Sequence, residues 1–216
     1  MKFPLLLFLF AITCISTVRA DHGGAVSRFG GHAPSHYEAV SSVVFQYRWF
    51  KFPALGVMSV DIRRNNFALV GMSQIGINVF ELSDRNGVVK CHMPGTLLER
   101  YPKIATGAVE DVRRMFFNYT PAPGAYRHDT AREVFFEEKS NGGTLQYRYD
   151  KATGLLLGKR FSVPSLFLQA RSVVWVVSYE NYAKSNGMTY AQVIRLKNRR
   201  LHYALSTRVT GMRIIN

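Results

Sequence analysis

The segment from Phe52 to Leu82 has the most regular pattern of apolar and polar positions in the chain. Between Ala54 and Arg64, apolar side chains alternate with polar ones, which predicts a strand with one buried face. Phe67 to Ser73 and Ile75 to Leu82 are apolar at neighbouring positions as well, so these strands must be covered on both faces or line a cavity on one. The segment therefore predicts a three-stranded meander and favours a container for an apolar ligand over a catalytic cleft.

The remaining pattern adds more short strands and one helix. Apolar and polar residues alternate from Val43 to Phe52, from Leu145 to Asp150 and along a hairpin from Tyr190 to Val209, while Arg171 to Glu180 is apolar on both faces. Ile104 to Phe117 places apolar residues on one helical face. The predicted fold class is therefore mainly β, of the α+β type: an antiparallel incomplete β-barrel or strongly curved sheet with a helical lid or plug.

The start of the chain has the pattern of a signal peptide. Lys2 precedes an apolar core from Leu5 to Ile15, and small residues lead to a cleavage site after Ala20. Cys14 lacks both the leucine and the small residue that precede a lipidated cysteine, so we expect cleavage rather than lipidation. The predicted organisation is a signal peptide at 1–20, a flexible leader rich in Gly and His at 21–36, and a single β-barrel domain at 37–216.

The charge of the chain narrows the choice of partners. There are 28 Lys and Arg against 14 Asp and Glu, a formal net charge of +14, and removal of Lys2 and Arg19 with the signal peptide lowers it to +12. Such an excess is typical of proteins that bind nucleic acid or an anionic membrane surface. Export disfavours nucleic acid, which leaves anionic lipid headgroups or an acidic partner, unless the charge only reflects a basic proteome.

No arrangement of residues predicts catalysis. The six His residues show no metal-binding spacing, and the run from Gly71 to Gly76 is one residue too long for the serine motif GxSxG. Cys91 and His92 are neighbours in a predicted strand, so their side chains point to opposite faces and cannot form a catalytic pair. We therefore expect a protein that is not an enzyme and that uses no metal or other cofactor.

Aromatic residues are the remaining candidates for a binding role. The 15 Phe, 11 Tyr and 2 Trp are interleaved with aliphatic residues through nearly every predicted strand. In a small barrel such side chains either fill the interior or line an open apolar cavity, and the sequence leaves both alternatives open. The predicted ligand-binding residues lie on the strands and on the helical lid: Phe45, Tyr47, Trp49, Met58, Val60, Ile62, Leu69, Tyr147, Leu157 and Trp175, with Val112, Met115 and Phe116 in the lid.

Two segments resemble a known family. The run Leu69-Val70-Gly71-Met72-Ser73, followed by Ile75-Gly76 and then Val79-Phe80-Glu81-Leu82, is similar to strands of the periplasmic lipoprotein-sorting proteins of Gram-negative bacteria, the LolA/LolB-like family. The hairpin from Tyr147 to Phe161 resembles that family's hairpin before its closing strands. The resemblance implies a periplasmic protein with an unclosed barrel that binds the acyl chains of lipoproteins, without cofactor or covalent chemistry.

The sequence predicts an exported carrier or chaperone that binds lipid or lipoprotein acyl chains in an apolar cavity, with an implied role in outer-membrane lipoprotein or lipid trafficking. Because Cys14 lacks a lipidation motif, a soluble periplasmic carrier fits better than an outer-membrane-anchored, LolB-like role. The expected partners are a lipid or acylated lipoprotein and an anionic membrane surface, with no nucleic acid. The alternatives are a packed β-barrel interaction module that acts through its basic surface, and a lipid-directed hydrolase with dispersed catalytic residues.

Overall fold

The structure, a computed structural model, describes residue 29 and residues 35–92, 103–164, 171–185 and 187–215. The predicted signal peptide, Cys14 and most of the predicted leader lie outside these residues. The elements are β1 (His36–Tyr47), β2 (Phe50–Asp61), β3 (Asn66–Met72), β4 (Asn78–Arg85), β5 (Val88–His92), α2 (Lys103–Phe116), β6 (Tyr126–Asp129), β7 (Glu133–Ser140), β8 (Gly143–Asp150), β9 (Leu156–Pro164), β10 (Arg171–Ser185), β11 (Met188–Asn198) and β12 (Tyr203–Ile214).

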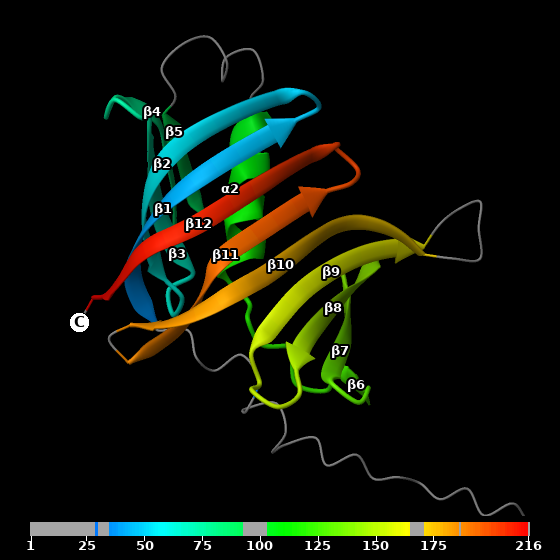
Figure 1. The fold of residues 1–216 in the computed structure, drawn as a ribbon. Coiled ribbons are helices and arrows are strands. Elements are labelled where there is room, and N and C mark those ends of the chain that lie inside the picture. The colour runs from blue at the N-terminus through cyan, green and yellow to red at the C-terminus, as the bar shows by residue number, and fades with distance from the viewer. Residues whose placement is uncertain (1–28, 30–34, 93–102, 165–170, 186, 216) are drawn as a thin grey trace, which may run out of the picture.

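All the strands belong to one antiparallel sheet. Its 12 strands follow the order β5-β4-β3-β2-β1-β12-β11-β10-β9-β8-β7-β6, so the first and last strands of the chain pair in the middle of the sheet. The sheet is strongly curved, its edges are β5 and β6, and helix α2 lies in its concavity (Figure 1). The predicted fold class, an open antiparallel sheet of α+β type with a helical lid, is confirmed.

Two hairpin turns are formed by Asn-Gly pairs. Asn86 and Gly87 have φ angles of 53° and 81°, and Asn141 and Gly142 have φ angles of 43° and 73°. Positive φ at both central residues matches the twist of the flanking strands, and it suits Asn followed by Gly because the pair tolerates the left-handed region. These turns connect β4 to β5 and β7 to β8.

The first strand differs from the prediction at both ends. The predicted strand ran from Val43 to Phe52, whereas β1 begins at His36 and the chain turns at Arg48 and Trp49 into β2. The small side chains of Ala39 and Ser41, although buried, gave the early part of the strand a weak hydrophobic pattern. The turn lacks the Gly or Asn that marks most two-residue turns, and Arg48 itself adopts a φ of 54°. Trp49 therefore does not share a strand face with Phe45 and Tyr47.

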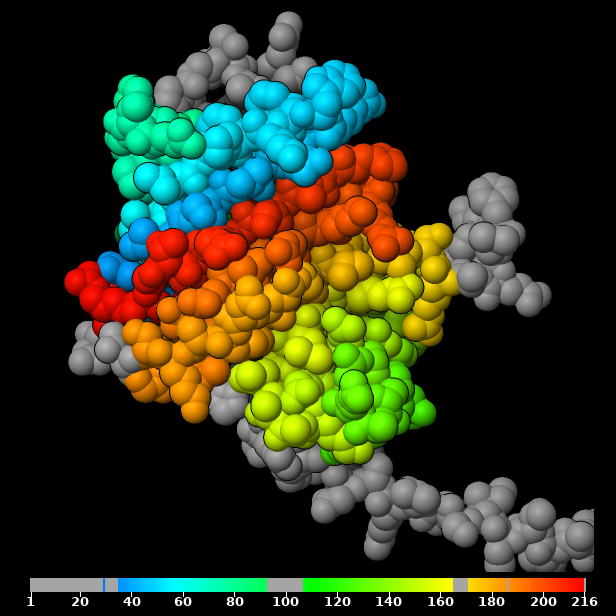
Figure 2. Space-filling view, in the orientation of Figure 1, coloured from blue at the N-terminus to red at the C-terminus, as the bar shows by residue number. Residues whose placement is uncertain are grey.

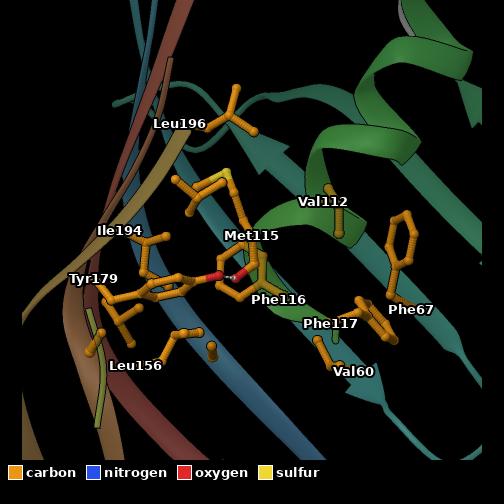
Figure 3. Close-up of a cluster of buried hydrophobic side chains, with 14 of the residues drawn as sticks. Val60, Phe67, Val112, Met115, Phe116, Phe117, Leu156, Tyr179, Ile194 and Leu196 are labelled. Carbon is orange, nitrogen blue, oxygen red and sulfur yellow. Dashed lines mark hydrogen bonds between the residues drawn. The ribbon is translucent and has the colours of Figure 1, made fainter. Parts of the chain in front are cut away.

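Helix α2 covers the concave face with one apolar side. Val109, Val112, Met115 and Phe116 are buried, while Glu110 is exposed, which is the pattern expected of an amphipathic helix. The buried side chains of α2 meet inward-facing residues of the sheet in one continuous core (Figure 3). The predicted helix, from Ile104 to Phe117, differs from the observed one by a single residue at each end.

The core also includes one residue of the segment predicted to be a flexible leader. Phe29 is 4% exposed, and its ring centroid lies 5.6 Å from that of Phe136 and 5.3 Å from that of Tyr149. The guanidinium of Arg127 lies over the Phe29 ring. At this position the chain therefore contributes to the domain core before β1 begins.

Candidate ligand-binding site

The concave face of the sheet has two chemically different halves. On β2, β3 and β4, the inward side chains of Met58, Val60, Phe67 and Leu82 are buried and carry no hydrogen-bonding group; we call this set the apolar half. On β8, β9 and β10, the inward residues include polar ones, which we call the tyrosine half: Tyr147, Tyr149, Lys159, Tyr179 and Tyr182. Cross-strand pairing of Tyr147 with Lys159 and of Lys159 with Val177 places the lysine on the inward face.

The tyrosine half holds the C-terminal end of α2 and the residues that follow it. The Tyr179 hydroxyl donates to the Met115 carbonyl at 2.9 Å (Figure 3), and the Tyr149 hydroxyl donates to the Tyr119 carbonyl at 2.5 Å. The last carbonyls of a helix have no partner within the helix, so donors from the sheet satisfy them. Burial raises the pKa of Tyr179 well above its ordinary value, which keeps its hydroxyl protonated as a donor.

Lys159 is the most unusual side chain on this face. It is 3% exposed, and its Nζ donates to the Phe117 carbonyl at 2.8 Å. The Nζ atom also lies 5.6 Å from the centroid of the Tyr119 ring and 5.7 Å from that of Tyr179. Burial lowers the pKa of Lys159 from 10.5 to about 7, because the charged ammonium loses its hydration. A carbonyl beyond a helix C-terminus is a favourable partner for such a group.

Two carboxylates fix the other sides of the helix. Arg113 donates through one terminal nitrogen to Asp84 of β4 at 2.6 Å, and Asp84 is 3% exposed. Asp111 is equally buried, where it accepts from Arg114 at 2.7 Å and from the Tyr203 hydroxyl of β12. Burial raises the pKa of Asp111, and these two donors oppose that rise. Helix α2 is thus tied to β4, β12 and β10 by polar contacts at separate points.

A cavity lies between the C-terminal end of α2 and the sheet. Its volume is about 50 Å³, and it is mainly apolar with several tyrosines. The lining residues are Tyr37, Phe116, Tyr119, Leu155, Leu156, Tyr179, Tyr182, Thr189, Tyr190, Ala191, Ile194, Val209 and Met212. Ligand pockets usually measure about 300–1,000 Å³, so this space can hold only a small part of a lipid unless α2 moves.

The predicted lining residues fall into three groups. Met58, Val60, Val112, Met115, Phe116, Tyr147 and Trp175 are buried in the core, with Ile62 and Leu69 packed against it. Phe116 is the residue of this set that borders the cavity. The others lie elsewhere: Trp49 is 86% exposed in the β1–β2 turn, Tyr47 is 42% exposed, and Phe45 and Leu157 are half-buried. A ligand contact for any of them stays a prediction.

Of the tyrosine half, the sequence analysis singled out Tyr147 and missed the other four residues, Tyr149, Lys159, Tyr179 and Tyr182. In the alternation of a strand, Lys159 falls on the same face as Phe161, and Tyr179 falls on the same face as Trp175 and Val177. A charged residue on an otherwise apolar strand face was therefore a readable signal for Lys159. The inward position of Tyr182 could not be predicted from alternation, because Asn181 has a φ of 54° and breaks the alternation of β10 just before Tyr182.

The described residues offer no metal centre and no membrane-spanning helix. Within residues 35–92, 103–164, 171–185 and 187–215, no three His, Cys, Asp or Glu side chains gather closely enough to hold a metal ion. In the same part of the chain, no helix has both the length and the apolar character needed to cross a bilayer. Cys91 is a half-buried free thiol of β5, and burial raises its pKa, which disfavours the reactive thiolate.

Comparison with solved structures identifies the class of fold. A LolA superfamily protein from Nitrosomonas europaea superposes with a TM-score of 0.59 at 9% identity, over 88% of this chain and 92% of that one. An outer-membrane lipoprotein-sorting protein domain from Vibrio parahaemolyticus gives a TM-score of 0.49 at 9% identity, over 87% and 88% of the two chains. A DUF1329 family protein from Desulfovibrio piger gives 0.48 at 7% identity, over 84% and 86%.

The chain has the LolA-like fold, which confirms the resemblance seen in the sequence at the level of fold. No family model matches the sequence, and no curated protein is significantly similar to it.

Proposed function

We propose that this protein is an exported carrier that binds the acyl chain of a lipid or lipoprotein on its concave face. Helix α2 acts as a displaceable cover. One observation carries the proposal: among the described residues, one 14-residue helix covers the concave face of a 12-stranded open sheet. The buried Val112, Met115 and Phe116 side chains of that helix occupy the place where an acyl chain would pack. The LolA-like fold supports the same function and a periplasmic location.

The buried apolar side chains of α2 and a buried acyl chain contribute free energies of similar size. Burial of a large apolar side chain contributes roughly 1.5–3 kcal/mol, so the buried residues of α2 contribute roughly 6–12 kcal/mol. A long acyl chain contributes on the order of 10 kcal/mol, at about 0.8 kcal/mol per CH2. In apolar burial alone, the helix and the ligand are therefore nearly balanced, which suits a carrier that must both take up and release its cargo.

A packed interaction module is the second candidate function. The small volume of the cavity, about 50 Å³, favours it, because a filled interior leaves no room for cargo without movement of α2. Such a module would act through its basic surface and would take up no lipid. The two functions therefore differ in a simple binding experiment.

The test uses a fluorescent fatty acid and two matched variants of the mature protein. Ala191 is buried and lines the cavity, whereas Ala204 lies on the convex face, opposite Lys197 and Gln46. Ala191→Leu fills the cavity. We expect it to weaken fatty-acid binding about tenfold, because roughly two CH2 groups of the ligand lose their burial there. Ala204→Leu adds the same bulk outside and should bind like the wild type.

Each outcome decides between the candidates, once circular dichroism has shown that both variants fold. Binding by the wild type that Ala191→Leu weakens and Ala204→Leu does not supports the carrier. If the wild type takes up no fatty acid, the packed interaction module becomes the favoured function. Equal binding by the wild type and both variants would move the ligand away from this cavity.

A further inference from the structure

One end of the sheet carries two exposed hairpin turns side by side. The β1–β2 turn consists of Arg48 and Trp49, and residues 199–202 connect β11 to β12. Because β1 pairs with β12 through Tyr47 and Tyr203, the two turns are neighbours in space (Figures 1 and 2). We call seven exposed residues of these turns and their flanks the hairpin tip: Arg48, Trp49, Phe50, Lys51, Arg199, Arg200 and Leu201.

The hairpin tip exposes large apolar side chains that the fold does not use. Trp49 is 86% exposed, Leu201 is 56% exposed and Phe50 is 54% exposed. Single exposed apolar residues are common on protein surfaces. Here a tryptophan at the apex of a tight turn is grouped with two more exposed apolar residues, and groups of this kind mark interaction sites. Tryptophan is enriched where a protein meets the interface of a bilayer, because its ring is both apolar and able to donate a hydrogen bond.

The charge of the hairpin tip is purely basic. The chain has no Asp or Glu between Glu38 and Asp61, and none after Glu180. Further along the same strands, Arg213 pairs with Glu38 and Arg195 pairs with Glu180. Within the described residues, no carboxylate forms an ion pair with the four basic residues of the hairpin tip, Arg48, Lys51, Arg199 and Arg200.

We infer that the hairpin tip is a docking site for an anionic lipid bilayer. Trp49, Phe50 and Leu201 enter the interfacial region, and the four basic residues contact lipid headgroups. A tryptophan together with clustered basic residues is the combination that favours an anionic bilayer interface. Each Lys or Arg near an anionic surface strengthens binding about fivefold, so the basic residues add to the apolar contact of Trp49, Phe50 and Leu201. The inference is independent of what the concave face binds.

Sedimentation with lipid vesicles tests the charge contribution. The mature protein should bind vesicles of phosphatidylcholine with phosphatidylglycerol and should bind pure phosphatidylcholine far less. Arg199→Gln/Arg200→Gln should weaken binding to the anionic vesicles roughly thirtyfold, from two headgroup contacts. The matched control is Arg63→Gln/Arg132→Gln, which removes the same charge from exposed turns at the other end of the sheet. It should bind like the wild type apart from a small effect of net charge.

Tryptophan fluorescence tests the apolar contact. The chain has two tryptophans, and Trp175 is 8% exposed, so a change in emission on binding reports mainly on Trp49. We expect the emission to shift to shorter wavelength with anionic vesicles and to be quenched by brominated lipid. Trp49→Ser should weaken vesicle binding about tenfold and abolish the shift. Trp175→Phe should retain the shift, and the sedimentation assay does not depend on this variant.

Three results would overturn the inference. The first is no preference for anionic vesicles. The second is an equal loss of binding in the Arg199/Arg200 variant and in its Arg63/Arg132 control. The third is a Trp49 emission shift with polyglutamate but not with vesicles, which would assign the hairpin tip to an acidic protein partner instead.

Discussion

Helix α2 rests on two surfaces that hold it differently. The apolar half of the concave face offers Val60 and Phe67, which pack in the same core as the helix without a hydrogen bond, while Asp84, opposite Phe67 on β4, pairs with Arg113 of the helix. The tyrosine half offers Tyr179 and Lys159, whose polar atoms reach carbonyls at and just beyond the end of the helix. Apolar packing is non-directional and an acyl chain can replace it, whereas hydrogen bonds to particular carbonyls fix one position. We therefore propose that cargo replaces the apolar contacts of the helix, whereas the hydrogen bonds of the tyrosine half latch its end.

The largest effect should come from the apolar half. Phe67 is 2% exposed, and its ring centroid lies 6.1 Å from that of Phe117. Phe67→Ala should lower the free energy of unfolding by about 3–5 kcal/mol, because it leaves a cavity under the helix. Urea denaturation measures this loss, with Val88→Ala, at a site 59% exposed, as a control that should change little. A loss below about 1 kcal/mol would mean that this half is not packed against the helix.

The second effect concerns Lys159 and is a dependence on pH. Between pH 7 and pH 9 the unfolded chain binds a proton at Lys159, whose ordinary pKa is 10.5, and the folded protein, with a pKa of about 7, does not. Stability therefore rises with pH across this window, by up to about 1.4 kcal/mol per pH unit. The buried tyrosines titrate only above it, since burial raises the pKa of each.

Lys159→Met should remove this rise, because the substituted side chain does not titrate. Urea denaturation of the wild type and the variant at pH 7, 8 and 9 measures the slope. Lys197→Met, at an exposed position of β11, is the matched control and should keep the wild-type slope. Equal slopes in wild type and Lys159→Met would show that Lys159 is not buried in the folded protein.

The smallest effect should come from a single hydroxyl of the tyrosine half. Tyr179→Phe removes the donor to the Met115 carbonyl, and we expect a loss of about 1 kcal/mol. If the tyrosine half latches the helix, the variant should also take up fluorescent fatty acid faster in stopped-flow experiments. Tyr126→Phe, at a site 68% exposed, should change neither quantity. Slower uptake by Tyr179→Phe would contradict the assignment of a latch.

Much of the fold could be predicted because it follows local patterns. Alternation located most strands, and the apolar stripe of α2 located the helix. Asn86-Gly87 and Asn141-Gly142 are residue pairs that favour the two turns that they form. Strand β6, of four residues, was not predicted, because Tyr126 to Asp129 has no apolar alternation. The turn at Arg48 and Trp49 was missed because its residue types rarely form such turns.

The site was harder to predict, because a strand pattern shows which face is buried but not what covers each part of it. Met58 and Val60 were correctly placed inside, yet the cavity lies against Ile194 and Tyr179, where the end of α2 crosses the sheet. A β-bulge between β8 and β9 also shifts the pairing of β9 by one residue. As a result, Leu156 and Lys159 both face inward, and Leu157 does not pair with β8. Such a change in register depends on the assembled sheet and leaves no clear mark in the sequence.

The most direct test of the carrier function is native mass spectrometry of the mature protein purified from its cell envelope, followed by solvent extraction. A carrier should show a discrete added mass that extracts as a lipid or an acylated peptide. This mass should fall in Ala191→Leu and persist in Ala204→Leu. A single mass equal to that of the polypeptide, with no added mass after incubation with fatty acid, would contradict the carrier account and favour a packed interaction module.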